Sequence, residues 1–244
     1  MTAEDVLALF APFDLTPEEA GYLPPQARRI AHVIDVVQRY CSMRSEPSHI
    51  LDVGPHFLTR CMAESITPRP IMSTLGYPFP KLMPPEMVHL HATMDFNDCI
   101  SQPPPFEPGT FDIITICEVV EHMLVPPDAV LSFLARMLKR PHGVILVGTP
   151  NAVSLTNRLR MMMGENPFQR LEHDWRSYRV HIREYTMQEL REYGAAANLR
   201  VAFEEYCDYW DYSIFVPGMN IMDVAFLEQD VPSYKNGLTI VYQH

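Results

Sequence analysis

The sequence predicts an α/β protein whose core is a parallel β-sheet. Short apolar runs recur through the middle of the chain at intervals of roughly twenty residues, separated by turns or helical patterns. The run at residues 111–117 is rich in β-branched side chains, which is typical of a strand buried on both faces. Polar residues and glycines follow several of these runs. Ligand-binding groups are therefore expected at the carboxyl edge of the sheet.

Composition excludes several classes of function. A chain of 244 residues with 47% hydrophobic content can form one large α/β domain or two small ones. A net charge of −11 argues against sequence-independent binding to nucleic acid, which rests on basic patches. No apolar run reaches about eighteen residues and no signal-peptide pattern is present, so we expect no membrane span. Five dispersed cysteines without a C-x-x-C pair predict reduced thiols in a cytoplasmic protein.

Residues 1–45 predict an N-terminal helical extension to a main domain at residues 46–244. Thr2 can cap a helix at residues 3–10, and Thr16 forms a second cap with Pro17 at the first helical position. Apolar residues recur at helical spacing from residue 25 to 40. This extension either covers one face of the sheet or helps to close the active site.

The first buried strand, residues 49–54, runs into Gly54 and is followed by a short helix at residues 61–65. A glycine allows the backbone to approach a ligand closely, and a helix start offers free N–H groups. The second strand, residues 70–75, ends at Gly76. The prolines that follow it predict a loop or a single turn up to residue 88.

Further elements complete the domain. Strands are expected at residues 88–94 and 143–148, with a helix at 129–139 between them. Residues 152–180 form a long, basic, Met-rich insertion, which is typical of a lid or binding segment. Thr186 and Glu189 form a capping box for a helix that ends near residue 197. Two closing strands, 201–209 and 237–242, are expected to flank an irregular segment.

Five motifs occur in a recognisable order: ILDVG at 50–54, DFND at 95–98, FDIITICEVVEHM at 111–123, GVILVGTPN at 143–151 and HIREYTMQELREYGAAANL at 181–199. With these motifs the chain resembles the class I S-adenosylmethionine-dependent methyltransferases. The similarity is to the branch of ubiquinone-pathway, small-molecule and sugar O-methyltransferases. The resemblance implies a Rossmann-like, seven-stranded, mostly parallel sheet with helices on both faces and an antiparallel last strand.

The resemblance also implies where S-adenosylmethionine would lie. Its adenine would be near Asp95 and Phe96, its methionine end near Cys117 and Glu118, and its centre over Gly54. Asp95 can accept a hydrogen bond from the adenine amine, and Phe96 can pack on the ring. The full set of residues expected to bind the cofactor is Asp52, Gly54, Pro55, His56, Gly76, Tyr77, Asp95, Phe96, Cys117 and Glu118.

Two departures from the family pattern leave alternatives open. The cofactor loop has one glycine instead of Gly-x-Gly-x-Gly, and the second strand ends at Gly76 and Tyr77 without the usual ribose-binding carboxylate. The cofactor is then held differently, through main chain and Tyr77, or binds weakly. The remaining alternative is a non-catalytic, methyltransferase-like regulatory or scaffolding protein.

Glu118, Glu121 and His122 stand at i, i+3 and i+4, so they share one face if this segment is helical. One interpretation is that Glu118 orients the cofactor amine and His122 is structural. The other is a site for Mg²⁺, Mn²⁺ or Zn²⁺, with His181 as fourth ligand, as in E-x-x-E-H relatives that hold a metal.

The expected reaction is attack by a hydroxyl of a small-molecule or carbohydrate acceptor on the cofactor methyl group. A metal would lower the pKa of that hydroxyl. Without a metal, His122 or His181 would act as general base, close to Glu121. The basic residues of the insertion either bind an acidic substrate or form a solvated face; they are Arg158, Arg160, Arg170, Arg176 and Arg179.

Overall fold

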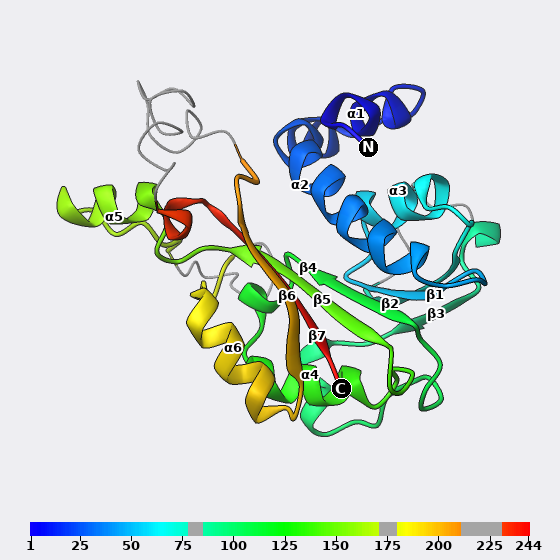
Figure 1. Ribbon diagram of the computed structural model, residues 1–244. Coiled ribbons are helices and arrows are strands. Elements are labelled where there is room, and N and C mark those ends of the chain that lie inside the picture. Colours follow the sequence, from blue (N-terminus) through cyan, green and yellow to red (C-terminus); the bar gives the residue numbers. More distant parts are fainter. Residues whose placement is uncertain (78–84, 171–179, 211–230) are drawn as a thin grey trace.

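The computed structural model describes residues 1–77, 85–170, 180–210 and 231–244. Its seven-stranded sheet has the order β3-β2-β1-β4-β5-β7-β6 (Figure 1). Neighbouring strands are parallel from β3 to β5, whereas β7 runs antiparallel to both β5 and β6. The predicted fold class is therefore confirmed. The strands are β1 His49–Val53, β2 Ile71–Gly76, β3 Leu90–Thr93, β4 Ile113–Cys117, β5 Val144–Pro150, β6 Arg200–Cys207 and β7 Gly237–Gln243.

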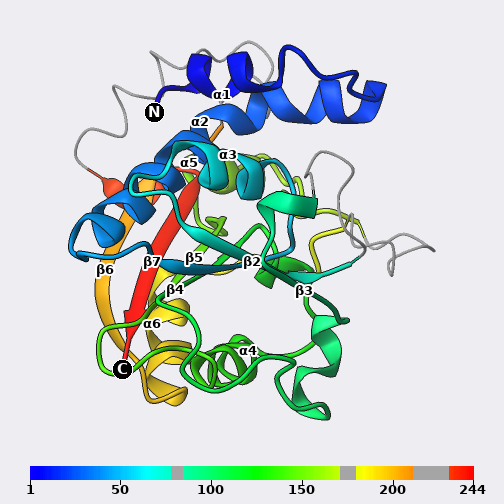
Figure 2. The ribbon, with the colours of Figure 1, turned by 90° about the vertical axis from the view of Figure 1, so that its right-hand side faces the viewer.

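Helices cover both faces of this sheet (Figures 1 and 2). Along β4, Ile113 and Cys117 pack into the apolar core beneath the N-terminal helices, whereas Ile114 and Ile116 pack into the core on the opposite face. This alternation follows from the two-residue period of a strand. The first face is covered by α1 Ala3–Phe10, α2 Pro17–Ser42 and α3 Phe57–Ser65, the second by α4 Pro127–Ala135 and α6 Met187–Ala196.

The predicted helix caps are present, but two boundaries differ from the prediction. Thr2, Thr16 and Thr186 each form a capping box. The helix that begins at Pro17 continues through Pro24 and Pro25 to Ser42 as one element. Prolines remove backbone donors, but the buried face continues across them, which compensates for the loss. The helix after Gly54 begins at Phe57, four residues earlier than expected.

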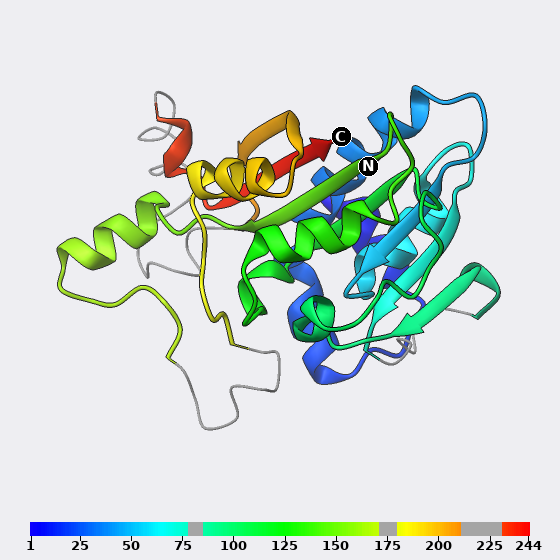
Figure 3. The same cartoon turned by 90° about the horizontal axis from the view of Figure 1, so that it is seen from below.

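Parts of the predicted loops contain regular structure. In the insertion, α5 Leu155–Met162 is helical and extends away from the sheet (Figure 3). Residues 171–179 of that insertion lie outside the described residues. In the proline-rich crossover, Pro85–Met87 form a single 3₁₀ turn, and residues 78–84 are not described. The segment before the last strand contributes the turn Pro232–Tyr234, whereas residues 211–230 are not described. Two further 3₁₀ turns are Phe96–Ile100 and Val120–His122.

A series of hydrogen bonds connects α2 to the sheet. The Tyr209 hydroxyl donates to the Leu238 carbonyl oxygen (2.9 Å) and lies 2.6 Å from the Thr239 hydroxyl. The His32 Nε2 atom lies 3.0 Å from the same Thr239 oxygen. Because a carbonyl oxygen can only accept, this series orders the protons so that His32 donates to Thr239. The nearby Cys207, like the other four cysteines, is a free thiol. No helix among the described residues is long and apolar enough to cross a membrane.

Candidate functional site

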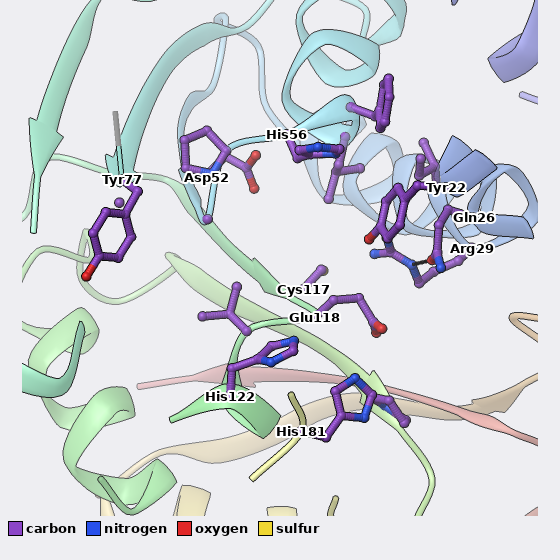
Figure 4. Close-up of a pocket in the computed structure, with 18 of the residues that line it drawn as sticks. Tyr22, Gln26, Arg29, Asp52, His56, Tyr77, Cys117, Glu118, His122 and His181 are labelled. Atoms are coloured by element: carbon purple, nitrogen blue, oxygen red, sulfur yellow. Dashed lines mark hydrogen bonds between the residues drawn. The ribbon is translucent and has the colours of Figure 1, made fainter. Parts of the chain in front are cut away.

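A cavity of about 790 Å³ lies at the carboxyl ends of the parallel strands, beneath the first half of α2 (Figure 4). The N-terminal helices therefore both cover the sheet and close this cavity. Most of the predicted site residues line it: Asp52, Gly54, Pro55, His56, Gly76, Tyr77, Phe96, Cys117, Glu118, His122 and His181. Asp95 and Glu121 do not line the cavity; they lie behind its wall.

The turn after β1 is held by the glycine and the buried aspartate that precedes it. Gly54 has a φ of 75°, and its N–H donates to the Leu75 carbonyl oxygen at 2.9 Å. The Asp52 carboxylate accepts hydrogen bonds from the hydroxyls of Thr59 and Thr115, both at 2.6 Å. Burial nevertheless raises the pKa of Asp52 to about 6. His56 is the N-cap residue of α3 and packs edge-to-face on Phe57.

The far end of the cavity is aromatic. Phe96 is buried and packs edge-to-face on Phe133, with ring centroids 6.0 Å apart. The Tyr77 hydroxyl donates to the Asp95 carboxylate at 3.2 Å, and the other Asp95 oxygen accepts from the Asn97 backbone N–H at 2.9 Å. Where the family pattern has a carboxylate at the end of the second strand, this chain therefore presents a tyrosine that is paired with the acid of the next loop.

The prediction that Glu118, Glu121 and His122 share one face of a helix is wrong. Glu118 has a φ of 56°, in the left-handed region, and only Val120–His122 form a 3₁₀ turn. The Glu118 N–H still donates to the Gly148 carbonyl oxygen (2.8 Å), so the sheet ladder extends to this residue before the chain turns. Glu118 and Glu121 therefore do not share a face as ligands of one helix.

The Glu118 side chain points into the cavity (Figure 4). Its Oε1 atom is buried and has no hydrogen-bond partner among the described residues. Burial, followed by repulsion from Glu121, raises the pKa of Glu118 to about 8. The thiol of the adjacent Cys117, whose pKa burial raises well above its ordinary value, is a neutral neighbour.

Arg29 also lines the cavity, although it was not predicted from the sequence as a site residue. It is only 4% exposed, and its Nε–H donates to the Gln26 Oε1 atom at 2.8 Å. Among the described residues no carboxylate lies within 4.0 Å of its guanidinium. Burial disfavours the charge on Arg29, but Glu118 and other neighbours outweigh this effect, and its pKa is raised. Arg29 shares a helix face with Val33 and Val36, so a lone arginine on an apolar face was the available signal.

A second group of titratable side chains lies below Glu118. Glu121 is fully buried, and its Oε2 atom accepts from the Thr149 hydroxyl at 2.9 Å. Its Oε1 atom has no hydrogen-bond partner in the part of the chain that the structure describes. Burial raises the pKa of Glu121 to about 7. One ligand atom each from Glu121, His122 and His181 lies within 4.8 Å of the other two. The structure thus brings together three of the four predicted metal ligands and leaves Glu118 out.

Hydrogen bonds orient both imidazoles of this group. His122 Nδ1 lies 3.0 Å from the Val180 carbonyl oxygen, which can only accept, so this nitrogen carries a proton and Nε2 keeps its lone pair. Burial and the neighbouring His181 lower the pKa of His122 to about 4. His181 Nδ1 lies 3.1 Å from the Glu184 carboxylate. A histidine that is oriented by a carboxylate in this way is suited to accept a proton at its other nitrogen.

The arginines of the insertion that the structure describes do not line the cavity. Arg158 donates to the Val153 carbonyl oxygen at 2.6 Å and lies over the Tyr234 ring. Arg160 forms an ion pair with Glu165 at 3.2 Å. These contacts are those of a solvated structural segment. Arg176 and Arg179 lie outside the described residues.

A comparison with known protein families identifies the family to which this chain belongs. A family model described as "Methyltransferase domain" matches residues 26–202, well over half of the chain. The chain belongs to this family. The match begins at Gln26. It therefore includes the second half of residues 1–45, which were predicted as an N-terminal extension. The sequence has no significant match among curated proteins.

Solved structures share the fold of this methyltransferase-domain protein at low sequence identity. A methyltransferase from Mesorhizobium loti, described as S-adenosylmethionine-dependent, is 12% identical, with a TM-score of 0.55 and coverage of 88% of this chain and 100% of that one. A SAM-dependent methyltransferase from Archaeoglobus fulgidus is 16% identical (TM-score 0.51, coverage 90% and 96%). Magnesium protoporphyrin IX methyltransferase from Synechocystis, solved with bound SAH, is 10% identical (TM-score 0.53, coverage 99% and 94%).

Proposed function

We propose that this methyltransferase-domain protein binds S-adenosylmethionine and transfers its methyl group to a hydroxyl of a small molecule or carbohydrate. The observation that supports cofactor binding is that Arg29 and Glu118 line the same cavity without forming an ion pair with each other. The amino-acid end of the cofactor bears a carboxylate and an ammonium group. A buried guanidinium without a carboxylate partner suits the first, and a buried carboxylate oxygen without a donor suits the second.

The cavity chemistry supports the rest of the cofactor placement. At its aromatic end, Phe96 offers a face for a flat ring, and Tyr77 offers a phenol where the family pattern has a ribose-binding acid. The Gly54 turn leaves the backbone accessible between the two ends. A volume of about 790 Å³ falls in the range of small-molecule sites, about 300–1,000 Å³. This argues for a small acceptor.

His181 is the residue we assign as general base. Its Nδ1 is oriented by the Glu184 carboxylate, so Nε2 is available to the acceptor hydroxyl. The cofactor supplies an electrophilic methyl group. As the bond from the acceptor oxygen to that methyl forms and the sulfonium–carbon bond breaks, the hydroxyl proton passes to His181. His122 is neutral at pH 7, because its pKa is about 4, and its Nε2 lone pair faces Glu121.

As an alternative to the base role of His181, the group of Glu121, His122 and His181 fits a divalent metal ion, and His181 would then be a ligand and not the base. The unpartnered Oε1 of Glu121 is a ready ligand, and each histidine has a hydrogen bond at Nδ1 of the kind that orients metal ligands. Two imidazoles and one carboxylate favour Zn²⁺ or Mn²⁺ over Mg²⁺. Such an ion would act as a Lewis acid on the acceptor hydroxyl. Metal analysis before and after chelation tests this: transfer that persists in excess chelator would rule out metal assistance.

The second candidate is a non-catalytic regulatory or scaffolding protein, which the single-glycine loop and the missing ribose acid favour. Calorimetric titration with S-adenosylmethionine and S-adenosylhomocysteine separates the two candidates. The enzyme proposal expects saturable binding of both, weakened at least about tenfold in Glu118→Gln. It also expects methyl transfer from labelled cofactor to at least one member of a panel of catechols and sugars. If neither cofactor binds at millimolar concentration, the enzyme proposal is wrong.

A further inference from the structure

The amide of Gln26 is held in one orientation by two donors from distant parts of the chain. Its Oε1 atom accepts from the Arg29 Nε–H at 2.8 Å and from the Trp210 indole N–H at 3.1 Å. Gln26 and Arg29 are one turn apart in α2, whereas Trp210 follows β6. An indole nitrogen can only donate. Trp210 therefore requires the oxygen, and not the NH₂ group, of Gln26 to occupy the position next to Arg29.

Trp210 is itself firmly held. It is 8% exposed, and its backbone N–H donates to the Asn236 side-chain oxygen at 3.2 Å. The Asn236 amide nitrogen returns a hydrogen bond to the Trp210 carbonyl oxygen at 2.9 Å. The adjacent Tyr209 N–H donates to the same Asn236 oxygen at 2.7 Å. The indole N–H is thus fixed relative to the start of β7, independently of any ligand.

The consequence for Arg29 is directional. A guanidinium has five N–H donors, and Gln26 takes the one on Nε. The donors that remain free of this contact are on the two Nη atoms, which form the end of the side chain. If the Gln26 amide were reversed, its NH₂ group would face the Arg29 N–H groups, and the two sets of donors would repel each other.

We propose that Gln26 and Trp210 are positioning residues that aim the Arg29 guanidinium at a ligand carboxylate. This inference rests on the proposed function, in which that carboxylate belongs to the amino-acid end of S-adenosylmethionine. It adds two residues that the five sequence motifs do not contain, one of them from the C-terminal part of the chain. The cavity wall includes all three of these side chains.

The test compares two ligands that differ in the amino-acid group. S-adenosylhomocysteine carries the carboxylate and ammonium, whereas 5′-methylthioadenosine retains the adenosine and thioether without them. We expect Trp210→Phe, which keeps the buried ring and removes the N–H, to weaken S-adenosylhomocysteine about 3- to 10-fold by calorimetry. Affinity for methylthioadenosine should stay within about twofold. Gln26→Leu should show the larger effect of the same kind.

A matched control lies on the same helix. The Gln38 side chain also makes hydrogen bonds, with the backbone N–H and carbonyl oxygen of Thr67 and with the Ser42 hydroxyl, but it does not line the cavity. Gln38→Leu should leave both affinities unchanged. Equal losses for both ligands in Trp210→Phe and Gln26→Leu, or no loss for either, would overturn the positioning role. The same holds if Arg29→Met leaves S-adenosylhomocysteine affinity intact, because the carboxylate would then come from an acceptor. If neither ligand binds the wild-type protein, the proposed function itself fails.

Discussion

Replacing Arg29 with methionine should stabilise the ligand-free protein while weakening its binding of the cofactor. The guanidinium is buried, and no described carboxylate lies within 4.0 Å of it. Glu118, with a pKa of about 8, is largely protonated at pH 7 in the empty cavity. The other groups that raise the pKa of Arg29 are a thiol and two phenols with raised pKa values, which are neutral at pH 7; they are Cys117, Tyr22 and Tyr209. These neighbours carry negative charge only at the high pH where Arg29 itself titrates, so at pH 7 they offer little counter-charge. Desolvation of an ion costs several kcal/mol, and the hydrogen bond to Gln26 offsets about 1.5–3 kcal/mol of it. Methionine keeps the apolar stem, so the free energy of unfolding should rise by up to about 2 kcal/mol.

The binding effect of the same substitution has the opposite sign. A charge-assisted hydrogen bond to a carboxylate contributes about 1.5–3 kcal/mol, which corresponds to about 10- to 150-fold in affinity. We therefore expect that loss for S-adenosylhomocysteine by calorimetry, and a change within about threefold for methylthioadenosine. Arg60 is the matched control, because it is also buried but forms an ion pair with Glu64 at 2.8 Å, away from the cavity. Arg60→Met should lower stability in urea denaturation and leave both affinities unchanged. A destabilised Arg29→Met protein with equal losses for both ligands would refute the reasoning.

Three further predictions concern the rest of the site. The raised pKa of Asp52, about 6 against 3.8, means that the folded state binds this proton more tightly than the unfolded state. Stability should therefore fall as the pH rises from about 4 to 7, by about 3 kcal/mol, and urea denaturation of Asp52→Asn should show a flatter pH profile. Gly54→Ala should lower the free energy of unfolding by at least about 1–2 kcal/mol, because φ is +75° and the new Cβ would lie 2.6 Å from Val119 Cγ2. Adding Val119→Ala should recover part of this loss in thermal denaturation. If Gly54→Ala alone leaves stability unchanged, the turn relaxes around the new side chain. His181→Ala should lower kcat at least about 100-fold with S-adenosylhomocysteine affinity within about twofold, and Glu184→Gln should lower it less; wild-type turnover without His181 would remove it as the base.

The fold could be predicted from the sequence because local and global signals agree. Short, mainly apolar runs bounded by turn residues predicted all seven strands, and Thr2, Thr16 and Thr186 mark helix starts through their capping boxes. The extent of α2 was predicted incorrectly because of the prolines at 24 and 25. Proline disfavours the interior of a helix, but here the packing of the buried helix face outweighs that local preference. The strand-end glycine at 54 also indicated the cavity correctly.

The chemistry of the site was harder to predict, because it depends on residues that the chain brings together from outside the motifs. Spacing alone placed Glu118 with Glu121 on a helix, but Glu118 itself has a left-handed backbone just after β4 and lies outside the 3₁₀ turn that contains Glu121. Arg29 lies far from every strand-end motif, and on an amphipathic helix a single arginine is usually solvated. Only the packing of α2 across the cavity mouth shows that it is buried.

Two unfavourable features meet in one wall of the cavity, and a single ligand would relieve both. Glu118 combines a left-handed backbone, which costs about 1–2 kcal/mol for a non-glycine residue, with a buried oxygen that has no donor. Arg29 adds a buried charge that has no carboxylate within 4.0 Å among the described residues. A zwitterion supplies the missing donor and the missing anion together, so part of its binding energy offsets strain that the empty protein already carries. Ligand at a hundred times the wild-type Kd raises the unfolding free energy of the wild type by about 2.7 kcal/mol. At that same ligand concentration the stabilisation should be smaller in any variant that removes either group, because its Kd is higher.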